Sequence, residues 1–353
     1  MRNRLLCCFV SAFVTDSLAA RNSVAWASSA VLFRPLRGGG ARFASMTTKR
    51  DTRGEGMAGT LFQYKSQQVH LQAFESGPLH AERKLVVLGG LSDGMLPCPY
   101  VPELAHALVE DGWSTVQVNL RSSYMQWGFG SLSQDVEDLT ALLDCLVEKR
   151  GASTLAVCGH STGSQIIAHL MRTRPHDRVS HVILQGGVSD RESDDAEETR
   201  ARSVALELAA STSSSSLSGG QEMMPRDTTW APVTAQRYMD LNAVAGADDY
   251  FSSDLSDAQL AERFGGFYSR TNVLIAYSAD DEYVAKSVDK RKLLRRLCEA
   301  MQGGGSRGGV GPVVVKVLVP GGDHALYAHT SADFFVDAAA AFLNDRPVAA
   351  ALE

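Results

Sequence analysis

The stretch TLAVCGHSTGSQIIAHLM, residues 154–171, contains an apolar run, a short turn with two glycines, and a second run with helical spacing. The first run predicts a buried strand and the second predicts a helix. Ser161 stands at the turn within the pattern G-x-S-x-G, in which the glycines give the backbone room for a strained turn. This unit, the nucleophile elbow, lifts the serine hydroxyl clear of the sheet and points a helix N-terminus at nearby negative charge.

The five-residue pattern alone is not specific, because it also occurs at residues 90–94 and 304–308. The pattern at 304–308 lies in a glycine run with no strand before it. The pattern at 90–94 follows a strand, but Pro97 and Pro99 prevent a helix from starting directly at its serine. Only Ser161 has a strand before it and a helix after it, so we expect Ser161 to be a nucleophile and not part of an ordinary turn.

Apolar runs alternate with amphipathic segments along much of the chain. Residues 84–88 are continuously apolar, as in a strand buried on both faces, and residues 60–77 predict two short strands of an antiparallel edge pair. Further strands are expected at 114–120, 179–184, 271–277 and 313–319, and helices at 100–111, 132–149, 286–301 and 331–344. Together with the elbow, this alternation predicts an α/β-hydrolase fold, with a mostly parallel central sheet flanked by helices.

Length and charge limit the possible functions. The 353 residues allow one large α/β domain or two smaller ones. A formal net charge of −6 gives no support for a general nucleic-acid-binding surface. No apolar run reaches the roughly 20 residues of a membrane-spanning helix. We therefore expect no nucleic-acid partner and no membrane span. The oligomeric state stays open, and the expected partner is a small-molecule acyl or ester substrate.

Residues 1–45 differ from the rest, because they carry six arginines and Asp16 as their only acid. This composition is typical of a mitochondrial transit peptide, although residues 5–14 also fit the apolar region of a secretory signal. A start at Met46 would instead leave a cytoplasmic protein. The later cysteines are widely spaced and indicate reduced core residues, neither a disulfide framework nor a metal site, which makes secretion the least favoured alternative. These are Cys98, Cys145, Cys158 and Cys298.

Residues 188–268 break the alternation and predict an insertion between two parts of a core, 60–187 and 269–346. The insertion contains an acidic segment, a helix through residue 210, a serine-rich segment at 211–220 and a second helix at 232–244. We interpret it as a partly mobile helical lid, because a cap inserted after this strand roofs the site in many such enzymes. The acidic segment is interpreted as a solvated helix face and not as a metal site.

The loop at residues 89–94 follows the strand at 84–88. In an α/β-hydrolase the loop at this place supplies one backbone N–H of the oxyanion hole. We expect Leu91 to supply that donor, and Thr162, the residue after the nucleophile, to supply the second. A plain glycine turn is the alternative.

The loop at residues 121–128 is polar and aromatic, and it follows a strand, which places it on the active-site side of an open α/β sheet. It either contacts the substrate or packs as a surface loop. The candidate substrate contacts are Ser122, Ser123, Tyr124 and Trp127 from this loop and Tyr250 from the insertion.

Three carboxylates follow the strand at 271–277, where the acid of a catalytic triad belongs. Asp281 is the expected acid and Asp280 is the reserve. A cap for the helix at 286–301 is the alternative role of these residues.

His324 follows the last strand and precedes the last helix, which is the position of the general base. His329 is a weaker candidate, one turn further on. His160 points the wrong way along the elbow and is expected to be structural.

The order Ser161, Asp281, His324 is the order of an α/β-hydrolase triad. His324 would accept the serine proton, and Asp281 would orient the imidazole and stabilise its charge. The expected function is cleavage of a carboxylic ester or related acyl bond through an acyl-enzyme, without metal or cofactor. A thioesterase, peptidase or lyase on the same fold, or a non-catalytic binding protein, is the alternative.

The chain resembles the DUF1749 family of α/β-hydrolases, and some fungal members of that family are regarded as siderophore ester hydrolases. The resemblance covers residues 60–345 and is carried by segments 90–94, 120–124, 159–163, 248–257 and 278–284, of which DYFSSDLSD at 249–257 is the most distinctive. It implies the fold and carries over Ser161, Asp281 and His324 as the triad, with Val284 as the apolar residue that usually stands three positions after the acid. The resemblance does not imply a substrate. Ala279, the serine-rich segment and the glycine loop at 303–311 depart from the family without touching the expected chemistry.

Overall fold

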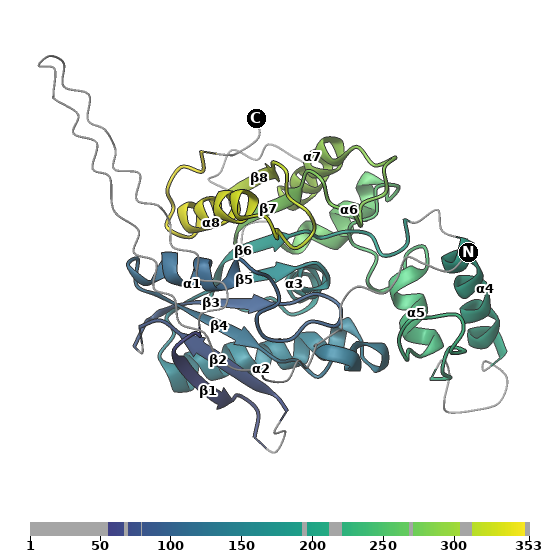
Figure 1. Cartoon of the computed structure of the whole chain (residues 1–353), viewed down its shortest axis with the longest axis horizontal. Helices are drawn as coiled ribbons and strands as arrows, with labels where there is room; N and C mark the ends of the chain where they lie inside the picture. The colour runs from purple at the N-terminus through teal and green to yellow at the C-terminus, as the bar shows by residue number, and fades with distance from the viewer. Residues whose placement is uncertain are drawn as a thin grey trace, which may run out of the picture. The chain divides into compact units, whose positions relative to one another are not determined.

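A computed structural model describes residues 56–66, 70–78, 80–192, 196–211, 221–267, 271–303 and 313–349. These residues build an eight-stranded sheet with the order β1-β2-β4-β3-β5-β6-β7-β8 (Figure 1). The strands are β1 (Gly59–Gln63), β2 (Gln72–Ser76), β3 (Arg83–Leu88), β4 (Trp113–Val118), β5 (Thr154–His160), β6 (Val179–Gln185), β7 (Asn272–Ser278) and β8 (Val314–Val319). β2 runs antiparallel to β1 and β4, and all other neighbours are parallel, which confirms the predicted sheet.

Successive side chains of the central strands point to opposite faces of the sheet. In β3, Val86 and Leu88 pack into one core cluster, whereas Leu85 and Val87 pack into the other. All four side chains are buried, because helices cover both faces, and this explains the continuous apolar run in the sequence. Burial of each such side chain stabilises the fold by roughly 1.5–3 kcal/mol.

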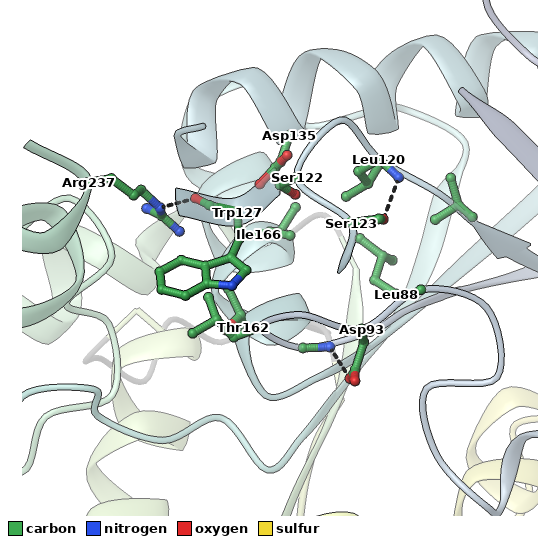
Figure 2. Close-up of a pocket in the computed structure, with 15 residues that line it drawn as sticks. Leu88, Asp93, Leu120, Ser122, Ser123, Trp127, Asp135, Thr162, Ile166 and Arg237 are labelled. Atoms are coloured by element: carbon green, nitrogen blue, oxygen red, sulfur yellow. Dashed lines mark hydrogen bonds between the residues drawn. The ribbon is translucent and has the colours of Figure 1, made fainter. Parts of the chain in front are cut away.

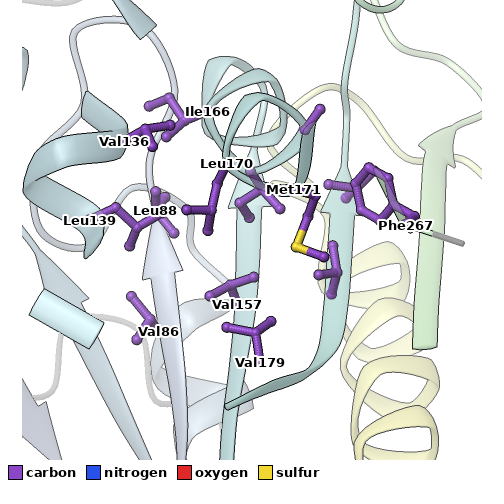
Figure 3. Close-up of a cluster of buried hydrophobic side chains, with 14 of the residues drawn as sticks. Val86, Leu88, Val136, Leu139, Val157, Ile166, Leu170, Met171, Val179 and Phe267 are labelled. Carbon is purple, nitrogen blue, oxygen red and sulfur yellow. The ribbon is translucent and has the colours of Figure 1, made fainter. Parts of the chain in front are cut away.

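Helices from both parts of the core cover the two faces. One face is covered by α2 (Leu132–Arg150), α3 (Thr162–Thr173), α6 (Asp257–Phe264) and α7 (Lys290–Met301), and the other by α1 (Val101–Val109) and α8 (His329–Leu343). Figure 3 shows Leu170 and Met171 of α3 packed over the strands that carry Val86 and Val157. The helices predicted for the core are therefore confirmed to within a few residues.

Two helices of the insertion pack against each other and not against the sheet, namely α4 (Ala196–Ser211) and α5 (Ala235–Asn242) (Figure 1). Their apolar cluster includes Trp127, which belongs to the 3-10 helix η1 (Tyr124–Phe129) in the loop after β4. The Thr234 N–H also donates to the main-chain oxygen of Gly128 at 3.0 Å. The insertion is thus anchored on the loop that the sequence placed beside the site.

The last part of the insertion belongs to the core. Tyr250, Phe251, Phe264 and Phe267 are buried in the same cluster as α3. α6 begins with the predicted capping box of Ser256 and Gln259. Residues before 250 are therefore the ones that remain candidates for a lid.

Several predicted features lie outside the described residues. They are the segment at 1–45, part of the acidic segment, most of the serine-rich segment and the glycine loop from 304 onward. Within the described ranges, none of the helices is both long and apolar enough to span a membrane.

Candidate active site

Ser161 lies in the sharp turn between β5 and α3, with φ 52° and ψ −122°. A positive φ is unfavourable for a residue with a side chain, and such strain is typical of the serine in a nucleophile elbow. Ser161 occupies the N-cap position of α3, but its side chain forms no capping hydrogen bond. Its hydroxyl is therefore available beside the positive end of the helix dipole.

The two glycines of the elbow are required by close packing. A Cβ at Gly159 would lie 2.4 Å from the carbonyl carbon of Gly163. A Cβ at Gly163 would lie 2.8 Å from the main-chain oxygen of Leu88. Both separations are too short for non-bonded atoms, so the motif reflects how tightly β5, α3 and the end of β3 meet.

His324 and Asp281 form a buried pair. His324 Nδ1 lies 2.9 Å from Asp281 Oδ2, and the Tyr283 N–H donates to Asp281 Oδ1 at 3.0 Å. An ionised carboxylate only accepts hydrogen bonds, so a neutral His324 carries its proton on Nδ1 and keeps Nε2 as an acceptor. The reserve candidates lie elsewhere, because Asp280 and His329 are both exposed.

Two charged residues hold the loops that carry this pair. The His324 N–H donates to Glu282 Oε2 at 2.9 Å. Lys290 Nζ donates to the main-chain oxygens of Ser278 at 3.2 Å and of Ala279 at 2.8 Å. These bonds tie the loop after β7 to the loop after β8 and to the start of α7. The sequence pattern did not single out Lys290, since a lysine at a helix start is usually a solvated residue.

Gln185, at the end of β6, connects the serine side of the site with the histidine side. Its main-chain oxygen accepts the Ser161 N–H at 2.9 Å, and its Nε2 donates to the main-chain oxygen of His324 at 3.0 Å. Its Oε1 accepts a hydrogen bond from His160 Nδ1 at 2.6 Å, and the rings of His160 and His324 lie with centroids 4.8 Å apart. In the described part of the chain no hydrogen bond joins the Ser161 hydroxyl to the His324 ring. Such bonds often tighten only when substrate binds.

The loop after β3 touches the candidate nucleophile. A Cβ at Gly90 would lie 2.8 Å from the Cβ of Ser161, so only glycine allows this approach. Asp93 Oδ2 accepts the Gly90 N–H at 2.8 Å and shapes the loop. Among the described residues, the N–H groups of Leu91 and Thr162 have no hydrogen-bond partner. Both predicted oxyanion donors are therefore available to a substrate oxygen.

A pocket lies beside the elbow (Figure 2). Five of the predicted site residues line it: Leu91, Ser122, Ser123, Trp127 and Thr162. Its apolar walls are Leu88, Val118, Leu120 and Ile166. The loop at 121–128 thus faces this pocket, as its place after a parallel strand predicted.

Two predicted substrate contacts do not line this pocket. Tyr124 is 54% exposed, and its ring lies against Gly94, where a Cβ would meet it at 2.2 Å. Tyr250 is fully buried, its hydroxyl bonds to His169 Nδ1 at 2.8 Å, and its ring packs against Phe264. The prediction of Tyr250 as a substrate contact is wrong, because the core encloses its side chain.

The pocket also contains charged residues that the sequence analysis missed. Arg237 of α5 pairs with Asp248 at 2.7 Å and donates from Nε to the main-chain oxygen of Trp127 at 3.1 Å. Asp135 of α2 lies beside Ser122, and burial raises the pKa of Asp135 to about 7. Asp135 could have been noticed in the sequence, because it lies on the apolar face of an amphipathic helix and carboxylates are rarely buried without a role. The described residues contain no cluster of His, Cys, Asp and Glu that could hold a metal ion.

The strand order and the strained turn after β5 place this chain in the α/β-hydrolase class. The chain belongs to the family DUF1749, described as a protein of unknown function, whose model matches residues 46–344. The resemblance found in the sequence motifs is therefore confirmed.

Several relatives of this chain carry the names of esterases or hydrolases. A UPF0613 protein of Schizosaccharomyces pombe is 37% identical over 236 residues, which cover 62% of this chain and 74% of that protein. The fusarinine C esterase sidJ of Aspergillus fumigatus is 30% identical over 292 residues, which cover 68% of this chain and 82% of the esterase. The solved structure of siderophore hydrolase EstB from Aspergillus fumigatus aligns with TM-score 0.68 and 27% identity, over 83% of this chain and 98% of EstB. The fold and these relatives support an enzyme that hydrolyses carboxylic esters.

Proposed function

We propose that this chain cleaves a carboxylic ester through an acyl-enzyme on Ser161, with His324 as general base and Asp281 as its orienting partner. The observation that carries the proposal is the 2.9 Å contact between His324 Nδ1 and Asp281 Oδ2. It leaves Nε2 of the imidazole to accept a proton, at the sheet edge where the elbow presents Ser161. The esterases among the relatives support the same reaction.

In the first half-reaction, His324 Nε2 takes the proton of the Ser161 hydroxyl as Oγ bonds to the carbonyl carbon of the ester. The carbonyl oxygen becomes an anion. The imidazolium, stabilised by Asp281, then gives its proton to the alcohol oxygen as the carbon–oxygen bond breaks. The alcohol leaves, and an ester between the acyl group and Ser161 remains.

The anion that forms in this step would bind to the N–H groups of Leu91 and Thr162. Thr162 is the first residue of α3, so the helix dipole adds to the stabilisation. The loss of one donor from an oxyanion hole typically lowers kcat by about 10²–10³. Asp93 supports the other donor by holding the Gly90 N–H, which fixes the loop around Leu91.

In the second half-reaction, His324 accepts a proton from water as the water oxygen bonds to the acyl carbon. The intermediate collapses when His324 returns the proton to Ser161 Oγ and the acyl–serine bond breaks. The products are a carboxylic acid and free enzyme, so no metal or other cofactor is needed to balance the reaction.

We also propose that the part of the insertion before residue 250 serves as a lid over the pocket. Arg237 of α5 lines the pocket, and the ring of Trp230 lies with its centroid 5.4 Å from that of Trp127. Both contacts join the insertion to a pocket wall, so its movement would change access to the site.

One relative is named as an esterase of fusarinine C and another as a siderophore hydrolase. Fusarinine C and siderophores that contain ester bonds are therefore the first natural compounds to test on this chain. Simple 4-methylumbelliferyl esters report the bond cleavage independently of any such preference.

A fluorophosphonate probe, which reacts covalently with activated serines, tests the proposal. We expect the wild-type chain to be labelled and Ser161→Ala to lose the label. Ser306→Ala should keep it, although Ser306 stands in another G-x-S-x-G match, at residues 304–308. Ester turnover should fall by about 10³ or more in Ser161→Ala. A folded wild-type chain that is neither labelled nor active, or a Ser161→Ala variant that remains both, would refute the proposal.

A further inference from the structure

Two buried polar atoms in the pocket have no hydrogen-bond partner among the described residues. They are Asp135 Oδ1 and Trp127 Nε1, on residues that are 1% and 6% exposed. A buried donor or acceptor left unsatisfied costs about 1–3 kcal/mol, and more when it is charged. Inside the pocket beside Ser161, Asp135 Oδ1 therefore lacks a hydrogen-bond donor and Trp127 Nε1 lacks an acceptor (Figure 2).

The neighbouring residues do not meet this requirement. Ser122 lies beside the Asp135 carboxylate, but Oδ1 has no hydrogen-bond partner among the described residues. Arg237 is committed to Asp248, at 2.7 Å, and to the main-chain oxygen of Trp127. A ligand group that enters the pocket can supply what these residues do not.

The pocket lies on the acyl side of the candidate nucleophile. His324 must reach the alcohol oxygen to protonate it, so the alcohol part of an ester lies toward His324. The pocket is instead lined by Leu91 and Thr162, the two oxyanion donors, and His324 is not part of its lining. The chain attached to the carbonyl carbon is therefore the part that enters it.

The chemistry of the pocket limits what that chain can carry. An ammonium group offers only donors, leaves Trp127 Nε1 unsatisfied and faces the guanidinium of Arg237. Above pH 7, where Asp135 is ionised, a carboxylate offers it no donor and is repelled by it. A hydroxyl or a carboxamide offers both a donor and an acceptor and carries no charge, so it matches the needs of both Asp135 and Trp127.

On the basis of the proposed function, we propose that this pocket selects an acyl chain with a neutral group that both donates and accepts hydrogen bonds. Asp135 accepts from that group and Trp127 Nε1 donates to it, while Leu120 and Ile166 enclose its carbon chain. A water molecule can occupy the same place in the free enzyme. A plain alkyl chain either leaves that water in its way or displaces it without replacing its bonds, and both lower affinity.

The test compares 4-methylumbelliferyl esters that share one alcohol and differ in the acyl chain: butanoyl, 3-hydroxybutanoyl, 3-aminobutanoyl and 4-carboxybutanoyl. We expect kcat/KM for one enantiomer of the 3-hydroxybutanoyl ester to exceed that for the butanoyl ester by about tenfold or more, since sites built for a hydroxyl discriminate strongly against its absence. The amino and carboxy esters should be the poorest substrates.

Two variants test whether Asp135 and Trp127 cause the preference for the hydroxybutanoyl ester. Asp135→Leu and Trp127→Phe should each bring the ratio of hydroxybutanoyl to butanoyl kcat/KM down toward one. Asp144→Leu, an exposed position on the same helix, is the matched control and should keep the wild-type ratio. Circular dichroism checks that each variant is folded, and if Asp135→Leu is not, Trp127→Phe and the wild-type ratio still decide the question.

The outcomes separate this inference from the proposed function. A wild-type chain that is labelled at Ser161 but cleaves the butanoyl ester at least as fast as the hydroxybutanoyl ester overturns the selectivity and leaves the ester hydrolysis standing. A wild-type ratio that survives both variants also overturns it. A chain that is neither labelled nor able to cleave any of the four esters overturns the proposed function itself.

Discussion

Gln185 Nε2 donates a hydrogen bond to the main-chain oxygen of His324 at 3.0 Å. Through this bond the end of β6 holds the loop after β8, and the main-chain oxygen of the same glutamine holds the N–H of Ser161 at 2.9 Å. The nucleophile and the base of the proposed mechanism are therefore both held by Gln185, Ser161 through its main chain and His324 through its side chain.

Gln185→Leu replaces the amide by an apolar side chain of similar size and so removes the hydrogen bond to His324. We expect kcat for ester hydrolysis to fall about tenfold or more with little change in KM, because small displacements of a reacting group are costly to the chemical step. Steady-state kinetics measures kcat and KM separately, and Ser180→Ala on the same strand is the control. An unchanged kcat in a folded variant would mean that Gln185 serves only packing.

Asp281→Asn keeps the shape of the acid and its ability to accept from Tyr283, but loses the charge that stabilises the imidazolium. We expect kcat to fall by about 10⁴. Asp280→Asn is the matched control, because Asp280 is exposed one residue earlier, and its activity should stay within about twofold of wild type. Equal losses in the two variants would contradict the assignment of Asp281 as the triad acid.

Gly159→Ala should destabilise the fold, because its Cβ would lie 2.4 Å from the backbone of Gly163. We expect the free energy of unfolding to drop by about 1–3 kcal/mol in urea denaturation. Gly265→Ala is the control, since nothing lies within 4 Å of a Cβ there, and Gly265 has a helical φ of −60°. That variant should be neutral or slightly more stable. If Gly159→Ala proves as stable as Gly265→Ala, the packing argument for the elbow fails.

Burial lowers the pKa of His160 from its ordinary value to about 3. The folded chain therefore keeps His160 neutral, whereas the unfolded chain binds a proton below about pH 6.5. This contribution to stability is fully present above pH 6.5 and is lost as the pH falls toward 3, by up to about 1.4 kcal/mol for each pH unit.

The check on His160 is urea unfolding at pH 7, 6 and 5 of the wild-type chain and His160→Gln, which cannot titrate. We expect the free energy of unfolding to fall more steeply with acid in the wild type than in the variant. Parallel pH dependences would show that His160 does not stay neutral in the folded chain.

Much of the fold follows from local sequence patterns. The apolar run at 84–88 predicts a strand with helices on both faces, and β3 is buried on both faces as expected. The elbow around Ser161 is encoded by neighbouring residues, so its strand, turn and helix could be assigned from the sequence. Because parallel strands end at the same edge of a sheet, the residues after β5, β7 and β8 could also be grouped into one candidate site.

The contacts that complete the site depend on residues far apart in the chain. The sequence left Asp280 and Asp281 as alternatives, and the structure pairs Asp281 with His324 because only its side chain turns inward. Tyr250 belongs to a motif of the family, yet it is enclosed in the core.

Local patterns thus encode the fold class, the elbow at Ser161 and the strand ends that carry the candidate residues, because each depends on backbone preferences and apolar spacing within one segment. Long-range packing sets which polar side chains meet, such as Gln185 with His160 and His324, and the buried Asp135 with the half-buried Ser122. The physical reason is that a buried polar group is stable only with partners, and those partners come from other segments whose approach no local pattern encodes.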